Sequence, residues 1–195
     1  MIYCFDIIRK GQITMTPLEI FAQILGFIGS GICIFSFQIR SVRILFCTQL
    51  ISIAFFTLHF ILLGAYTGAL QNVLALVRCI LLILSDKKWA HNNWILAGLL
   101  VSFVVSGIAT YSGIFSLLPM IAMIVSTVAM WTSDGFKLRV AQVCVTSPAW
   151  LVYNASVFSI SGVLTESFNI ISVIVSFIRY GKNYDKKAGQ SVDEK

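Results

Sequence analysis

The sequence predicts an all-α membrane protein in which seven transmembrane helices form a 3+1+3 arrangement, two parallel three-helix repeats joined by one linker helix. The composition, 58% hydrophobic and 11% charged residues, lies far outside the range of soluble domains. The chain also contains seven apolar runs near the length of about 20 residues that a helix needs to cross a bilayer. Since these runs are continuously apolar rather than alternating, they indicate helices and not barrel strands.

An internal repeat supplies the third observation. Residues 59–78, HFILLGAYTGALQNVLALVR, return as residues 153–172, YNASVFSISGVLTESFNIIS. Placing each residue on the one 94 positions later pairs Gly68 with Gly162 and Asn72 with Glu166, and no gap is needed. A register that holds across three successive runs indicates two copies of one three-helix unit, a plan found in many transporters.

The first unit is expected at 18–85, after an extracytoplasmic arm at 1–17. Translation starts at Met1 or at Met15, and the sequence leaves this open. The three apolar runs of the unit span 18–38, 44–63 and 66–84. Gly64 lies between the second and third runs and predicts a tight turn there.

A linker segment at 86–112 follows, with a hydrophilic loop and the fourth and shortest run, 94–109. Three crossings would invert a directly repeated unit, so one extra helix restores the same orientation to both copies. The second unit is expected at 113–179, with runs at 114–131, 138–158 and 160–178, and a cytoplasmic tail occupies 180–195. Pro119 and Pro148 lie within the second unit and are assigned structural or gating roles, because proline interrupts helical hydrogen bonding.

The basic residues alternate between loops and predict the topology. Connections near Ala65, Tyr111 and Ser159 carry no Lys or Arg, so the positive-inside rule places the N-terminus outside and the C-terminus in the cytoplasm. This distribution explains the net charge of +6 without a nucleic-acid partner. Lipid is the expected environment. The sequence leaves open whether the protein forms a homo-oligomer. The basic residues of the other connections are Arg40, Arg43, Lys87, Lys88, Lys137 and Arg139, with Arg179, Lys182, Lys186 and Lys187 after the last run.

The residue patterns do not favour a metal, a cofactor or an enzyme. The five cysteines are scattered and show no CxxC or Cys/His spacing, so buried free thiols are the expected state. The sequence also has no HExxH or GxSxG motif and no pair of intramembrane aspartates.

Polar and aromatic side chains within the apolar runs mark the candidate site, because such residues usually face a bundle interior. We expect them to hold a small polar solute between the two units. Glu166 is expected to carry a proton with the solute if it faces a dry interface, and to stay ionised if it faces water. Arg78 is expected to be a structural anchor. The alternative is a non-transporting receptor or scaffold in which these side chains form a structural network. The five candidate ligands are His59, Asn72, Trp150, Asn154 and Glu166.

Several segments carry a resemblance to a known family: HFILLGAY, LLPMIAMIVSTVAMW, SPAWLVYN and SISGVLTE, with Arg179 thirteen residues after Glu166. Across residues 15–180 the chain resembles the YgjV family of bacterial inner-membrane proteins, which has no established substrate. It is more distantly similar to the PQ-loop and SWEET transporters, a likeness that implies substrate contacts at Asn72 and at Glu166 or Asn169. The Pro-Gln pair of that group is absent, and Phe37-Gln38 and Trp131-Thr132 stand in its place.

Overall fold

The computed structural model describes residues 15–36, 42–84, 92–132 and 135–180. Within these ranges all regular structure is helical, as expected from the continuous apolar runs. Some features predicted from the sequence lie outside the described residues. They are the N-terminal arm to residue 14 with Cys4, the tail from residue 181, and the loop residues Arg40, Lys87 and Lys88.

The first half of the fold contains α2 (Pro17–Ser36), α3 (Val42–Leu62) and α4 (Tyr66–Ile83). A capping box starts α2: Thr16 N donates to Glu19 Oε2 at 2.7 Å, and Glu19 N donates to Thr16 Oγ1 at 3.3 Å. Gly64 lies in the predicted turn between α3 and α4 with a φ of 68°, a conformation that costs glycine little. The helix limits follow the apolar runs closely.

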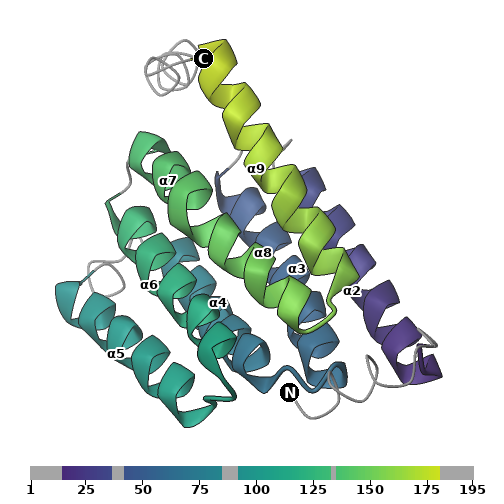
Figure 1. Ribbon diagram of the computed structural model, residues 1–195. Coiled ribbons are helices and arrows are strands. Elements are labelled where there is room, and N and C mark those ends of the chain that lie inside the picture. The colour runs from purple at the N-terminus through teal and green to yellow at the C-terminus, as the bar shows by residue number, and fades with distance from the viewer. Residues whose placement is uncertain (1–14, 37–41, 85–91, 133–134, 181–195) are drawn as a thin grey trace.

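Helix α5 (Asn93–Ala109) follows and packs against α4 and α6 (Figure 1). The Asn92 side chain caps its first turn by accepting a bond from Trp94 N at 3.1 Å. Two side chains of α4 tie it in place: Thr67 Oγ1 donates to Thr110 O at 2.6 Å, and Gln71 Nε2 donates to Phe103 O at 3.0 Å. Through these bonds α5 is attached to the bundle by polar contacts as well as apolar ones.

The second half begins with a 3₁₀ turn (Ile114–Ser116) and α6 (Leu117–Trp131), and it ends with α9 (Ile160–Tyr180). Between them α7 (Gly135–Ala141), a π-turn (Gln142–Thr146) and α8 (Ser147–Ser156) form one continuous helical segment. This segment begins at Gly135, three residues earlier than the run predicted from 138.

The two prolines occupy different helical contexts. Pro148 directly follows the π-turn, and both features disturb the regular ladder of backbone hydrogen bonds. Pro119 lies in the first turn of α6, where the backbone N–H groups have no partner within the helix. A kink at Pro119, expected from the sequence, is therefore not required by a lost helical bond.

The α3–α4 and α8–α9 turns have the same backbone geometry. Gly64 and Phe158 are 94 positions apart, and both have positive φ, 68° and 55°. A bulky residue rarely adopts this conformation, so the second turn holds Phe158 in a position that glycine occupies in the first. Each turn is closed by two backbone bonds at the same offset: Gly64 N to Ile61 O (3.0 Å) and Ala65 N to Phe60 O (2.9 Å), and Phe158 N to Ala155 O (3.3 Å) and Ser159 N to Asn154 O (2.9 Å).

The helix contacts of the two halves also correspond to one another. Helix α3 packs against both α2 and α4, and the segment formed by α7, the π-turn and α8 packs against both α6 and α9. Across the interface α2 packs on α9, and α4 packs on α6 (Figure 1). The first helix of each half therefore contacts the third helix of the other.

The exterior is apolar and the interior contains many polar groups. Large apolar side chains such as Phe21, Val101 and Ile171 are more than half exposed, whereas Gln71 and Ser161 are fully buried. By length and composition, helices at Pro17–Phe35, Tyr66–Ile83 and Ile114–Trp131 are long and apolar enough to cross a membrane. This distribution suits a helical bundle surrounded by lipid.

Candidate functional site

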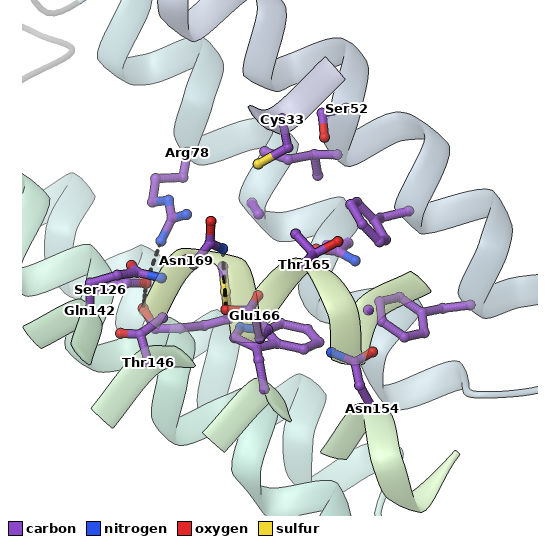
Figure 2. Close-up of a pocket in the computed structure, with 18 of the residues that line it drawn as sticks. Cys33, Ser52, Arg78, Ser126, Gln142, Thr146, Asn154, Thr165, Glu166 and Asn169 are labelled. Carbon is purple, nitrogen blue, oxygen red and sulfur yellow. Dashed lines mark hydrogen bonds between the residues drawn. The ribbon is translucent and has the colours of Figure 1, made fainter. Parts of the chain in front are cut away.

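A cavity of about 170 Å³ lies between the two halves of the bundle (Figure 2). Its lining includes Cys33 of α2, Ser52 of α3, Asn72 of α4, Ser126 of α6 and Asn169 of α9. The π-turn and α8 complete it. Every helix of both halves except the short α7 thus contributes a side chain to one space.

The cavity lining reproduces the sequence repeat. Five lining residues of the first half have lining counterparts 94 positions later in the second, so the cavity lies where the equivalent faces of the two halves meet. The paired residues differ in chemistry, an amide against a carboxyl group in one case and an alanine against an asparagine in another. The cavity is therefore symmetric in position and asymmetric in the groups it presents. The pairs are Ser52 and Thr146, Phe56 and Trp150, Phe60 and Asn154, Asn72 and Glu166, and Ala75 and Asn169.

One helical stripe forms much of the second half's wall. Gln142, Thr146, Trp150 and Asn154 all line the cavity and follow one another at intervals of four residues. Side chains four apart lie on the same helical face, so the stripe continues from the π-turn into α8. The π-turn thus lies within the site, as π-turns often do.

Glu166 is the acidic side chain of the cavity and is partly buried. Asn169 Nδ2 donates to Glu166 Oε2 at 3.3 Å, and the Ser147 hydroxyl interacts with the carboxyl group. Ser147 Oγ in turn accepts a bond from Gln142 Nε2 at 2.7 Å. Its hydroxyl proton is therefore available to Glu166, and both neighbours suit a carboxyl group that accepts hydrogen bonds.

Arg78 brings a positive charge to the same cavity and is only 6% exposed. Its Nη1 donates to Ser126 Oγ and to Thr127 Oγ1, both at 2.9 Å. In the described part of the chain no acidic side chain pairs with it. The guanidinium is consequently held by neutral hydroxyl groups alone.

Several buried polar atoms around the cavity have no hydrogen-bond partner among the described residues. Most buried polar groups in proteins are hydrogen-bonded, so each of these exceptions calls for a partner such as water or a polar ligand. Both asparagine side chains are buried, Asn154 with 2% and Asn169 with 8% of its surface exposed. The atoms are Arg78 Nε, Thr146 Oγ1, Asn154 Oδ1 and Asn169 Oδ1.

An aromatic wall faces these polar groups. Phe60 and Trp150 stack with ring centroids 5.8 Å apart at an angle of 23°, and Phe56 lies 6.3 Å from Phe60. All three rings line the cavity. The site therefore combines a flat apolar surface with charged and amide groups, a combination typical of small-molecule pockets.

Four of the five ligands expected from the sequence lie together at the cavity: Asn72, Trp150, Asn154 and Glu166. His59 does not line it. Its Nδ1 is 2.7 Å from Ala22 O and its Nε2 is 2.7 Å from Ser159 Oγ, and the side chain is fully buried. Both ring nitrogens are engaged, which suits a structural role, and the expected ligand role of His59 stays a prediction.

The expected role of Arg78 is that of a structural anchor, and its position in the cavity wall also makes it available to a ligand. The roles expected for Pro119 and Pro148 stay predictions, and neither proline is among the lining residues. Sequence reasoning missed several polar lining residues, although the repeat offset applied to Ser52 locates Thr146. The missed residues are Cys33, Ser52, Ser126, Gln142, Thr146 and Thr165.

Comparisons with known proteins agree with a membrane assignment. Residues 20–184 match the family model Imp-YgjV, described as a bacterial inner membrane protein. The chain is similar to inner membrane protein YgjV of Escherichia coli (strain K12), with 27% identity over 125 residues. That alignment spans 63% of this chain and 63% of the relative. No solved structure matches.

Proposed function

Because the chain belongs to the Imp-YgjV family of bacterial inner membrane proteins, we propose that it is a transporter or facilitator of a small polar solute, which binds between two three-helix units. The observation that carries this proposal is the cavity, lined by equivalent residues of both halves and surrounded by unpartnered polar atoms. Many transporters bind their substrate near the bilayer midplane at the interface of two repeats.

The volume of the cavity limits the size of the solute. An engineered protein cavity of about 150 Å³ holds benzene. The cavity of about 170 Å³ thus suits a molecule with a similar number of non-hydrogen atoms. Since its walls present amide, hydroxyl and charged groups, the molecule must be polar on at least one side.

The proposal includes the 3+1+3 plan. Units at 18–85 and 113–179 have the same orientation, and the 86–112 segment with α5 joins them. The crossed packing of α2 on α9 and α4 on α6 supports it, because two units related by a two-fold axis would make such a pair of equivalent contacts. The alternation of basic residues between loops supports an outer N-terminus and a cytoplasmic C-terminus.

Flux measurements in proteoliposomes test this function. A panel of small labelled polar solutes should include one that crosses faster with the protein than without it. Ala75→Met places a flexible side chain into the cavity and should block this flux, because Ala75 is 2% exposed and lines the space. The matched control is Ala97→Met on the exposed face of α5, which should leave flux unchanged.

The outcome separates the transporter from a receptor or scaffold. A solute that binds at the cavity and does not cross the membrane would assign the protein a receptor role. Flux that is insensitive to Ala75→Met would place the pathway elsewhere.

A further inference from the structure

Two opposite charges face the cavity, Arg78 from α4 and Glu166 from α9. Figure 2 shows both side chains at the same space, together with Asn154 and Asn169. We propose that the solute is a small zwitterion, whose carboxylate binds Arg78 and whose ammonium group binds Glu166. This inference rests on the proposed function for the site and adds the chemical class of the solute.

Each of the two charges lacks a counter-charge among the described residues. Arg78 is held by the hydroxyls of Ser126 and Thr127, and Glu166 by Ser147 and Asn169. Removing a charge from water is costly unless an opposite charge and hydrogen bonds replace the lost solvation. A ligand that carries both charges would complete both ion pairs at once.

The charge balance of the site selects the class of ligand. One guanidinium and one carboxylate sum to zero, so a ligand with no net charge leaves the site neutral. A simple anion would pair with Arg78 and leave Glu166 without a cation. A simple cation would do the reverse. A molecule with both groups offsets both desolvation penalties while both side chains stay ionised.

Further groups suit the two ends of such a molecule. Arg78 Nε has no partner in the described part of the chain and adds a second donor for a carboxylate, which guanidinium groups bind in a bidentate manner. Asn169 Oδ1, also unpartnered there, is an acceptor of the kind that binds the N–H groups of an ammonium. The faces of Phe60 and Trp150 can attract the same cation.

The size of the cavity requires a short carbon frame between the charges. Alanine has as many non-hydrogen atoms as benzene, which a cavity of about 150 Å³ accommodates. A volume of about 170 Å³ therefore accommodates amino acids of this size.

Calorimetry on the purified full-length protein tests the inference with a matched ligand series. Glycine, β-alanine, L-alanine and L-serine provide both charges, propionate only the carboxylate, and n-propylamine only the ammonium. At least one zwitterion should bind roughly 30-fold more tightly than either single-charge analogue, because an unpaired buried charge costs about 2 kcal/mol or more. If none of the four binds, or if propionate or propylamine binds equally well, the inference is wrong.

Two isosteric substitutions then identify the charges involved. Glu166→Gln should weaken zwitterion binding and shift the preference towards propionate, and Arg78→Gln should shift it towards propylamine. The control is Glu19→Gln, which makes the same carboxyl-to-amide change in the capping box of α2, where glutamine also serves. A structural role alone would lower all affinities together and would not exchange the preferences.

The remaining outcomes distinguish this inference from the transport proposal. If Glu166→Gln retains zwitterion exchange and loses uptake driven by a pH gradient, Glu166 is a proton-coupling group and the inference is overturned. Zwitterion binding without flux in proteoliposomes would overturn transport and leave the ligand class standing. Flux of uncharged polyols without zwitterion binding would overturn the ligand class and leave transport standing. The ligand series on the unsubstituted protein decides the question even if a variant fails to fold.

Discussion

His59 and Tyr153 occupy equivalent positions in the two halves, and each bonds the start of the last helix of the opposite half. His59 Nε2 lies 2.7 Å from Ser159 Oγ, while Tyr153 OH accepts a bond from Gly68 N at 2.9 Å and donates to Ala65 O at 3.4 Å. Ser159 and Ala65 are themselves 94 positions apart. A reciprocal pair of contacts therefore holds the two halves together beside the cavity.

Replacing His59 with alanine should destabilise the protein without acting directly on the solute. It removes two side-chain hydrogen bonds and leaves Ala22 O and Ser159 Oγ without these partners, a loss of roughly 2–3 kcal/mol in unfolding free energy. Tyr153→Phe should cost less, about 1–2 kcal/mol, since it removes only the hydroxyl. Denaturation in detergent measures both changes. Unchanged stability with lost solute binding in His59→Ala would support the ligand role instead.

Gly68 and Gly162 occupy equivalent positions in the two halves, and neither should tolerate a methyl group. A Cβ on Gly68 would lie 2.8 Å from Tyr153 Cε1, and one on Gly162 would collide with the Asn154 amide. Gly68→Ala should lower the melting temperature, and Gly162→Ala should also weaken solute binding by displacing Asn154. Gly98→Ala meets nothing within 4 Å and should be neutral or stabilise by up to about 1 kcal/mol. Equal effects of all three changes would contradict the close packing.

Arg78→Leu should keep the fold and lose solute binding. Ser126 Oγ and Thr127 Oγ1 each donate to Met123 O, at 3.2 and 2.6 Å, so both hydroxyls stay bonded without the guanidinium. The guanidinium of Arg78 has no acidic partner among the described residues, so its removal in Arg78→Leu should change the free energy of unfolding by less than about 1 kcal/mol. Melting curves and calorimetry on the same sample check this. A variant that unfolds would show instead that Arg78 is an anchor.

Asn72→Ala and Trp150→Phe should abolish or strongly reduce flux while protein level and melting stay close to those of the unsubstituted protein. Asn72 lines the cavity and forms no hydrogen bond within the described residues, so its loss leaves no protein group unpaired. Trp150→Phe retains an aromatic ring against Phe60, whereas alanine there would cost about 3–5 kcal/mol and confuse the readout. Intact flux in both variants would show that the solute does not contact Asn72 or Trp150.

Single cysteines in a background without the native ones test the topology. Cysteines at Tyr66, Tyr111 and Ile160 should react with an impermeant reagent added outside intact cells, and those at Trp94 and Thr132 should not. These positions are exposed, unlike Ala65 and Ser159, which are buried at the ends of the same connections. Any single reversal breaks the 3+1+3 plan.

The sequence alone determined the helices, because the length and continuity of an apolar run define a membrane-length helix without reference to its neighbours. The predicted run 114–131 corresponds to the 3₁₀ turn and α6 together, and the run 160–178 to α9. The repeat is also visible in the sequence alone, because equivalent residues of the two halves are separated by a constant 94 positions. Its offset pairs Asn72 with Glu166 and predicts that both belong to one site, and both line the cavity.

The tertiary structure decided which side chains meet. Helix α3 is apolar on almost every side, and so its sequence does not indicate which face points inward. Packing turns His59 towards Ala22 and Ser159 while Ser52 and Phe56 of the same helix face the cavity. Arg78 and Glu166 lie 88 positions apart in the sequence. They reach a single site only because α4 and α9 both line the same cavity. The packing of the helices decides which face of each one points into that cavity.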